Sequence, residues 1–184
     1  MKVKPIISNN IRIRYPDCFT VGEGSVIDDF SYFSVKMSVG RFCHIGPSVS
    51  VIGGKEEDLV MEDYSCIVTG SRVICASDDW RFELNSCLPP DFPVKKGSIK
   101  GGVLFAKFAT TGANSIIMPN NFIKEGVAIG AGSFVPADFD FKPWTIYVGA
   151  PIRPIRERDE IAVRKQAEQV EIYLNHLNGG VDGY

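Results

Sequence analysis

An apolar residue recurs at every sixth position along two long stretches of the chain, and this repeat constrains the fold more than any other feature. The first stretch runs Val21, Ile27, Phe33, Val39, Ile45 and Val51, and the second runs Ile99, Phe105, Thr111, Ile117, Ile123, Ile129 and Val135. Only Thr111 is polar. An α-helix repeats about every 3.6 residues and a half-buried strand about every two, so neither accounts for a step of six.

Small or modest side chains follow four positions after these apolar residues. They include Ser25, Ser31, Met37, Cys43 and Val49 in the first stretch, and Ala109, Ser115, Asn121, Val127 and Ser133 in the second. A large residue followed by a small one suits a short flat strand that ends at a tight corner. We therefore predict an all-β solenoid whose stacked coils enclose an apolar core. A β-sandwich fits less well, because its turns come about every 8–12 residues and less regularly.

The repeat is interrupted twice. Met61, Ile67 and Val73 keep the step of six in a shifted register, so the preceding segment 53–60 is predicted to carry an insertion. From Asp79 to about Ser98 the repeat is lost, and the prolines of "LPPDFP" exclude regular strand pairing there. Because this segment also holds aromatic side chains, we expect an ordered loop that protrudes from the solenoid.

A helix is expected near the C-terminus, from about residue 157 to 178, because apolar side chains there are spaced by four and three residues. The resulting stripe consists of Val163, Ala167, Val170, Leu174 and Leu177. It is predicted to pack on the solenoid or on a neighbouring subunit, and two glycines at 179–180 to end the helix. The chain therefore divides into a solenoid domain at 1–156, with an insertion loop at about 79–98, and a helix and tail at 157–184.

Charge and cysteine content exclude several classes of function. A net charge of −2 gives no indication of nucleic-acid binding by overall electrostatics, and no apolar run is long enough to span a membrane. The five cysteines, an odd number without a CxxC pair, are typical of reduced thiols rather than of a disulfide framework. We therefore expect a cytoplasmic protein that binds neither nucleic acid nor membrane.

Two segments near the C-terminus, "NSIIMPNNFIKEGVAIGAGSFV" (114–135) and "YVGAPIRPIRER" (147–158), resemble the hexapeptide-repeat acyltransferases. The stretches "FCHIGPSVSVIGG", "EDYSCIVTGSRVICASDDW" and "CLPPDF" resemble a narrower branch that N-acylates nucleotide-linked amino sugars. This branch includes the anthrose-pathway enzyme that acts on dTDP-4-amino-4,6-dideoxyglucose. The resemblance implies a left-handed parallel β-helix, a homotrimer with active sites between subunits, acetyl-CoA or another acyl-CoA as co-substrate, and a nucleotide sugar as acceptor. It also implies a role in surface-polysaccharide biosynthesis, such as that of lipopolysaccharide O-antigen.

The adjacent acids of "ICASDDW" are the first candidates for proton transfer. In the branch that the chain resembles, the first acid of an Asp-Asp-aromatic motif is the candidate base, which corresponds to Asp78. Consecutive strand residues point to opposite faces. We therefore expect Asp78 to project outward and accept the ammonium proton, while Asp79 shapes the loop beside the substrate. A pair of solvated turn acids is the alternative.

A second candidate base is His44, which follows the inward-facing Cys43 and should face outward, although it also fits an ordinary surface histidine. For substrate binding, Trp80 can stack on a base or sugar, and Arg72 and Arg81 can hold phosphate oxygens. Each of these three could equally serve loop packing. The resemblance implies an acyl-CoA site formed by Gly112, Asn114, Gly130, Ala131 and Gly132, with Arg153 and Arg156 near the CoA phosphates.

Two alternative functions remain open, and a third fails on the sequence. An O-acetyltransferase that acts on a glycan or small acceptor usually needs a histidine base, and the segment 79–98 holds none, which favours an amine acceptor. A non-catalytic scaffold is suggested by the break in the repeat at Thr111 and by a missing histidine, which related chains often carry where this chain has "KFATTGANS". A γ-type carbonic anhydrase shares this solenoid but needs three zinc-binding histidines. The chain has only His44 and His176, so we expect no metal.

Overall fold

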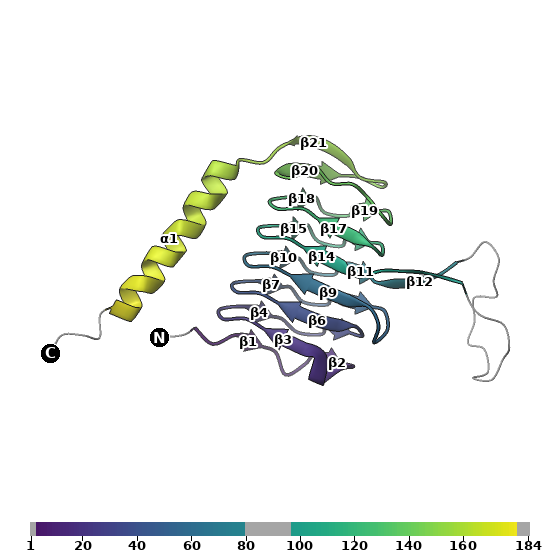
Figure 1. The fold of residues 1–184 in the computed structure, drawn as a ribbon, viewed down its shortest axis with the longest axis horizontal. Coiled ribbons are helices and arrows are strands. Elements are labelled where there is room, and N and C mark those ends of the chain that lie inside the picture. The colour runs from purple at the N-terminus through teal and green to yellow at the C-terminus, as the bar shows by residue number, and fades with distance from the viewer. Residues whose placement is uncertain (1–2, 80–96, 180–184) are drawn as a thin grey trace.

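Three β-sheets run the length of the molecule and enclose one core (Figure 1), and their strands are parallel except for the final strand of one sheet. The computed structural model describes residues 3–79 and 97–179. The chain passes from the first sheet to the second and the third, and then returns to the first one coil further on. We call these sheets the first, second and third walls. The predicted solenoid with a C-terminal helix is confirmed.

The walls have eight, six and five strands. The first wall contains β1 (Ile6–Ile7), β4 (Val26–Ile27), β7 (His44–Ile45), β10 (Cys66–Ile67), β15 (Thr110–Thr111), β18 (Ala128–Ile129), β20 (Thr145–Val148) and β21 (Arg153–Glu157). The second wall contains β2 (Arg12–Ile13), β5 (Tyr32–Phe33), β8 (Ser50–Ile52), β11 (Arg72–Ile74), β16 (Ile116–Ile117) and β19 (Phe134–Val135). The third wall contains β3 (Phe19–Val21), β6 (Lys36–Val39), β9 (Asp58–Met61), β14 (Val103–Phe105) and β17 (Asn121–Ile123). Outside the walls lie the 3₁₀ turn η1 (Pro16–Cys18), the pair β12 (Ala76–Asp78) and β13 (Ser98–Lys100), and α1 (Glu160–Gly179).

The residues of the six-step repeat stack directly on one another in the core. In the first wall Ile27 pairs with Ile45 and Ile45 with Ile67, and all three are at most 1% exposed. Thr111 continues this column at 2% exposure. Its hydroxyl oxygen accepts a hydrogen bond of 3.1 Å from the backbone amide of Val68, which satisfies the buried polar group. A polar residue therefore fits the column without breaking it.

The small residues lie at the corners, where the backbone of the next coil leaves little space. Ser25 is fully buried, and its hydroxyl donates a 2.8 Å hydrogen bond to the carbonyl of Gly40 on the next coil. Ser115 is fully buried too, and its hydroxyl donates a 3.0 Å bond to the carbonyl of Gly130. The corner hydroxyls thus join adjacent coils as well as filling space.

The register shows where the chain departs from regular coils. Val21 pairs with Val39, 18 residues later, but Val39 pairs with Met61, 22 residues later. The additional residues confirm the predicted insertion between β8 and β9. Met61 then pairs with Phe105, 44 residues later, because the chain leaves the prism and returns. Figure 1 shows the strands β12 and β13 projecting from one side of the prism, away from α1.

The excursion corrects one detail of the predicted core. Ile99 belongs to the six-step series in the sequence, but it lies on β13 and is 39% exposed. The chain has left the prism by this point, and it rejoins the third wall only at Val103, which is 1% exposed.

The C-terminal helix buries only part of its predicted apolar stripe within one chain. Within the expected apolar stripe Leu174 is 8% exposed, but Val170 and Leu177 are 37% and 50% exposed. The helix lies beside the corner between the third and first walls, where Arg164 and Glu171 form ion pairs and a hydrogen bond with the coils. Part of the predicted stripe therefore packs on the solenoid of the same chain, and packing of its exposed part on a neighbouring subunit stays a prediction.

Two corner glycines allow a test of how tightly the coils pack. Gly126 and Gly132 both adopt left-handed backbone angles, with φ of 70° and 66°. A Cβ added to Gly126 would lie 2.3 Å from the Trp144 ring, whereas one added to Gly132 would meet nothing within 4 Å. We expect Gly132→Ala to cost about 1–2 kcal/mol of unfolding free energy from backbone strain alone. Gly126→Ala should cost roughly 1–3 kcal/mol more because the ring must move. Equal losses in urea unfolding would show that the ring contact carries no weight.

Candidate functional site

The arm formed by β12 and β13 carries the two adjacent acids. The strands pair antiparallel, with Asp78 opposite Ser98, and the backbone amide of Asp79 donates to the carbonyl of Gly97 at 3.4 Å. Both acids are half-buried. We expected Asp78 on a coil wall, but the chain leaves the prism after Cys75, so Asp78 lies on the arm. Trp80 and Arg81 lie outside the described residues.

The base of the arm is fixed to the prism. The amide of Gly101 donates to the carbonyl of Cys75 at 3.0 Å, at the point where the chain leaves and rejoins the coils. Lys100 places its Nζ 3.9 Å from Glu57 Oε1, and Glu57 is only 7% exposed. Glu57 belongs to the predicted insertion at 53–60, so this insertion supports the root of the arm and Asp78 is presented from an anchored strand.

His44 lies on the first wall and faces outward, with its side chain 49% exposed. Its Nε2 is 2.8 Å from Asp28 Oδ2, and its Nδ1 is 3.9 Å from Cys66 Sγ. Asp78 extends from the corner between the second and third walls, so one chain does not bring these two candidate bases together. His176, in the last turn of α1, is exposed.

The residues expected to hold acyl-CoA gather where the first wall turns into the second, on coils toward the C-terminal end. We call Gly112, Asn114, Gly130, Ala131 and Gly132 the glycine corner. A Cβ on Gly112 would lie 2.3 Å from the amide nitrogen of Ala131, and one on Gly130 would lie 2.5 Å from Val148 Cγ1. Those two glycines are therefore required by packing between coils. Gly132 has open space beside it, which leaves room for a ligand to approach the backbone.

Three arginines flank the glycine corner. Arg153 pairs with Val148 across β21 and β20, which places it beside the corner, and Arg156 pairs with Ile146 further along the same strands. Both are exposed. Arg72 begins β11, and its Nη1 donates a 2.6 Å hydrogen bond to the carbonyl of Gly70. The corner is thus lined by backbone and flanked by positive charge.

An aromatic ladder runs along the corner between the third and first walls. Phe42, Tyr64 and Phe108 stack with centroid separations of 5.5 Å, and Trp144 lies 5.9 Å from Phe108. All four residues have left-handed backbone angles. The sequence patterns considered above did not predict this ladder, although each of its rings comes three residues after a buried apolar residue (Val39, Met61, Phe105 or Phe141). That offset was the available signal.

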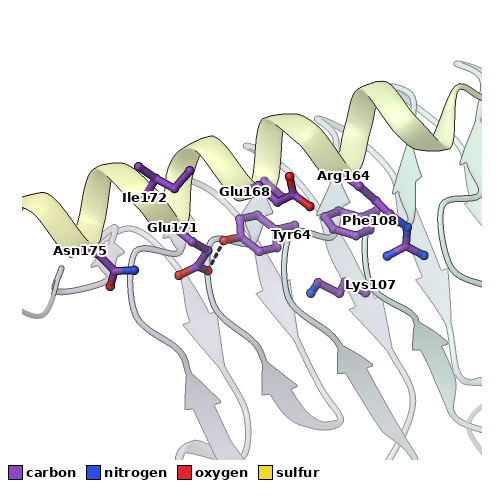
Figure 2. Close-up of a pocket in the computed structure, with 9 residues that line it drawn as sticks. Tyr64, Lys107, Phe108, Arg164, Glu168, Glu171, Ile172 and Asn175 are labelled. Carbon is purple, nitrogen blue, oxygen red and sulfur yellow. Dashed lines mark hydrogen bonds between the residues drawn. The ribbon is translucent and has the colours of Figure 1, made fainter.

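The helix α1 covers the ladder and leaves a cavity of about 440 Å³ between them (Figure 2). The Tyr64 hydroxyl donates a 2.5 Å hydrogen bond to Glu171 Oε1, and Arg41 Nη2 lies 3.4 Å from the same oxygen. Arg164 pairs with Glu125 at 2.9 Å and places its guanidinium 5.0 Å from the centre of the Trp144 ring. The helix is thus attached at two separate points along the ladder.

Tyr64 and Glu171 line this cavity and bind each other, whereas Arg158 lies outside its lining. The hydrogen bond from Tyr64, with the nearby Arg41, holds the pKa of Glu171 below its usual range. Burial, together with the bond to Glu171, raises the pKa of Tyr64. Arg158 donates to the carbonyls of Phe108 and Gly126, and burial lowers its pKa. This cavity therefore lies where α1 attaches to the solenoid. The candidate bases Asp78 and His44 lie elsewhere, on the arm and on the first wall.

Within residues 3–79 and 97–179, no group of three or more His, Cys, Asp or Glu side chains is arranged to hold a metal ion. In the same ranges, no helix has the length and apolar character needed to cross a membrane. The cysteines that the structure describes, Cys18, Cys43, Cys66 and Cys75, are free thiols.

Comparison with known proteins gives consistent matches over most of the chain. A dTDP-4-amino-4,6-dideoxy-D-glucose acyltransferase of Escherichia coli is 34% identical over 149 residues, which is 78% of this chain and 74% of that protein. The structure of AntD, an N-acyltransferase from Bacillus cereus in complex with dTDP and 3-hydroxybutyryl-CoA, matches with a TM-score of 0.79 and 34% identity, over 96% of this chain and 89% of that one. A serine-to-alanine variant of AntD, in complex with dTDP-4-amino-4,6-dideoxyglucose and coenzyme A, matches with a TM-score of 0.79, 33% identity and 92% coverage of both chains. No family model matches the sequence.

The attachment of α1 gives a pH-dependent prediction. Because the folded-state pKa of Glu171 is lowered, its contribution to stability is fully present at neutral pH and is lost as the pH falls through that lowered pKa. We expect Glu171→Gln to lower the unfolding free energy at pH 7 by about 0.2–1 kcal/mol, the range for an exposed ion pair. The difference from the wild type should shrink in acid.

Urea unfolding at neutral and acidic pH measures this difference. Glu168→Gln is the control, since Glu168 lines the same cavity but does not belong to the Tyr64, Arg41 and Glu171 cluster. A difference between wild type and Glu171→Gln that stays constant from neutral to acidic pH would contradict the assignment.

Proposed function

This chain belongs to the family of dTDP-4-amino-4,6-dideoxy-D-glucose acyltransferases, and from that premise we propose its acceptor, its reacting residues and its assembly. It has the left-handed parallel β-helix of the hexapeptide-repeat acyltransferases. It is an acyl-CoA-dependent N-acyltransferase that acts on a nucleotide-linked amino deoxysugar. The acceptor that we propose is a dTDP-linked 4-amino-4,6-dideoxy sugar. The observation that carries this proposal is the match, across 92% of the chain, to AntD holding that sugar nucleotide and coenzyme A.

The reaction joins an amine to an acyl group and releases a thiol. The amine nitrogen attacks the thioester carbonyl, a C–N bond forms and the C–S bond breaks, and CoA leaves as the thiol. Only the neutral amine can attack, so the ammonium form must first lose a proton. Asp78 takes that proton in our proposal. The support is its place on an anchored strand, paired with Ser98 and projecting from the prism.

The glycine corner is the proposed site for acyl-CoA. Its open side at Gly132 lets the pantetheine chain approach backbone amide and carbonyl groups. Arg153 and Arg156 are exposed on β21 nearby and can donate to phosphate oxygens. For the nucleotide sugar we propose Arg72 and Asp79, with Trp80 and Arg81 beyond the described part of the arm.

The two proposed half-sites lie at different corners of one chain. Asp78 extends from the corner between the second and third walls, whereas the glycine corner joins the first and second walls. A homotrimer, in which the arm of one chain approaches the glycine corner of the next, would complete the site. We propose this assembly. Light scattering should then give the mass of three chains, and a monomer with full activity would contradict it.

We also propose that the enzyme works in the cytoplasm, on a sugar destined for surface polysaccharide such as lipopolysaccharide O-antigen. Acyl-CoA and nucleotide sugars are cytoplasmic metabolites, and the four free thiols that the structure describes suit a reducing compartment. Cell fractionation that places the protein in the periplasm or outside the cell would contradict the location.

The acceptor class can be tested by release of free thiol from acetyl-CoA. We expect thiol release with amino sugars, and fastest with dTDP-4-amino-4,6-dideoxyglucose among sugars carried on dTDP, UDP and GDP. The matched control is the dTDP sugar with a hydroxyl at the same carbon, which should release none. Release with that hydroxyl sugar would indicate O-acylation. No release, together with no thermal stabilisation by acetyl-CoA, would indicate a scaffold, because a ligand at a hundred times its Kd adds about 2.7 kcal/mol.

The role of Asp78 can be separated from that of Asp79. Asp78→Asn should lower kcat by roughly a hundredfold or more, since the variant cannot take the ammonium proton. Asp79→Asn should act mainly on KM for the nucleotide sugar. Acetyl-CoA should stabilise both variants as it does the wild type. Steady-state kinetics with the amino sugar measures both constants. The reverse pattern would move the base to Asp79, and an unchanged kcat in both would reject a carboxylate base on the arm.

A further inference from the structure

Three side chains on the outer face of the first wall form a cluster that the proposed reaction does not use. His44 pairs in register with Cys66 on the next coil, so their side chains stand side by side on the same face. Asp28 lies on the preceding coil, and its Oδ2 is 2.8 Å from His44 Nε2. The Sγ of Cys66 lies 3.9 Å from the other ring nitrogen, Nδ1. The order is carboxylate, imidazole, thiol.

The carboxylate determines which ring nitrogen is basic. A carboxylate only accepts hydrogen bonds, so the contact with Asp28 places the proton of the neutral ring on Nε2. Nδ1 then carries the lone pair and faces the thiol. Asp28 therefore acts as a positioning residue that fixes both the tautomer and the orientation of the ring.

Cys66 is poised to react only with the help of a base. Its thiol is half-buried, and burial raises its pKa, so it stays protonated at neutral pH. A thiol in that state becomes nucleophilic when a base within reach removes its proton during attack. His44 stands in that position. A nucleophile in contact with a base that is itself oriented by a third group is the arrangement used in covalent catalysis.

The thiol also lies close to the proposed acyl-CoA site. Cys66 pairs with Thr110 of β15, and Gly112 of the glycine corner follows Thr110 by two residues on the same coil. Both lie on the first wall or its edge, one coil apart. A thioester held at the glycine corner is therefore near the outer face on which Cys66 stands. We propose that Cys66 is a covalent acyl-acceptor site, loaded from acyl-CoA with His44 as its base.

The step is a thioester exchange and needs no further reactant. Cys66 Sγ attacks the carbonyl carbon of acyl-CoA, its C–S bond forms, and the bond from that carbon to the CoA sulfur breaks. The thiol proton passes through His44 Nδ1 to the departing CoA sulfur. One thioester replaces another, so atoms and electrons balance. The proposal that Cys66 accepts an acyl group rests on the acyl-CoA site proposed above. It does not depend on the identity of the sugar.

The test is incubation of the full chain with acetyl-CoA in the absence of any amino sugar. Mass spectrometry should show one added acetyl group on the peptide that contains Cys66. Neutral hydroxylamine should remove it, as expected for a thioester. Cys66→Ala should abolish the label. The matched control is Cys18→Ala, which removes another half-buried thiol, remote from His44 on the third-wall side, and should leave the label in place.

Variants of His44 and Asp28 distinguish a thiol that these two residues activate from a thiol that is only accessible to acetyl-CoA. His44→Gln and Asp28→Asn keep Cys66 and should slow its labelling by about tenfold or more. Labelling that survives Cys66→Ala, or that proceeds at the wild-type rate in His44→Gln, would overturn the proposal. So would the absence of label in a protein that acetyl-CoA stabilises and that turns over the amino sugar. A labelled Cys66 without turnover of any amino sugar would instead sustain this site and contradict the proposed acceptor.

Discussion

The register between coils is the constraint on which the rest of this structure depends. Each coil must place its apolar residues over those of the coil before it, as Ile45 lies between Ile27 and Ile67. Adjacent coils lie in close contact at Gly112 and Gly130, because a Cβ on either glycine would collide with the next coil. Extra residues are therefore tolerated only where they leave the prism. Both departures from the regular period, the insertion before β9 and the arm, lie at the corner between the second and third walls.

That constraint separates the chemical groups of this acyltransferase by location. The arm presents Asp78 from the corner that accepts insertions, and Glu57 of the smaller insertion contacts Lys100 at its root. The glycine corner combines close contact between coils at Gly112 and Gly130 with open space beside Gly132, where the backbone is accessible. The first wall carries Asp28, His44 and Cys66 on successive coils because equivalent positions of parallel coils stand side by side. The regular register thus sets where each function can be placed.

Much of the fold could be predicted from the sequence, because the residues of the six-step repeat are those that fill the core. Ile27 and Ile117 could be assigned to the interior from spacing alone, and both are buried. The exceptions have physical reasons. Ile99 keeps the spacing by coincidence on a segment outside the prism, and the ion pairs of α1 join it to residues on distant coils, which spacing along the helix does not reveal. The outward direction of His44 followed from its inward neighbour, but Asp28 could not be foreseen as its partner without knowing the register between coils. The place of Asp78 on the arm required knowledge of where the chain leaves the prism.

The way in which α1 spans the aromatic ladder bears on how the solenoid unfolds. In a simple stack each coil touches only its neighbours, so an end can fray without disturbing the middle. Here one rigid element binds Arg41 and Tyr64 through Glu171, and Glu125 and Trp144 through Arg164. The helix therefore connects several coils to one another. Unfolding of the coils at either end of α1 must therefore break contacts of the helix that also hold the coils at its other end. The solenoid should then unfold more cooperatively than a stack in which each coil contacts only its neighbours.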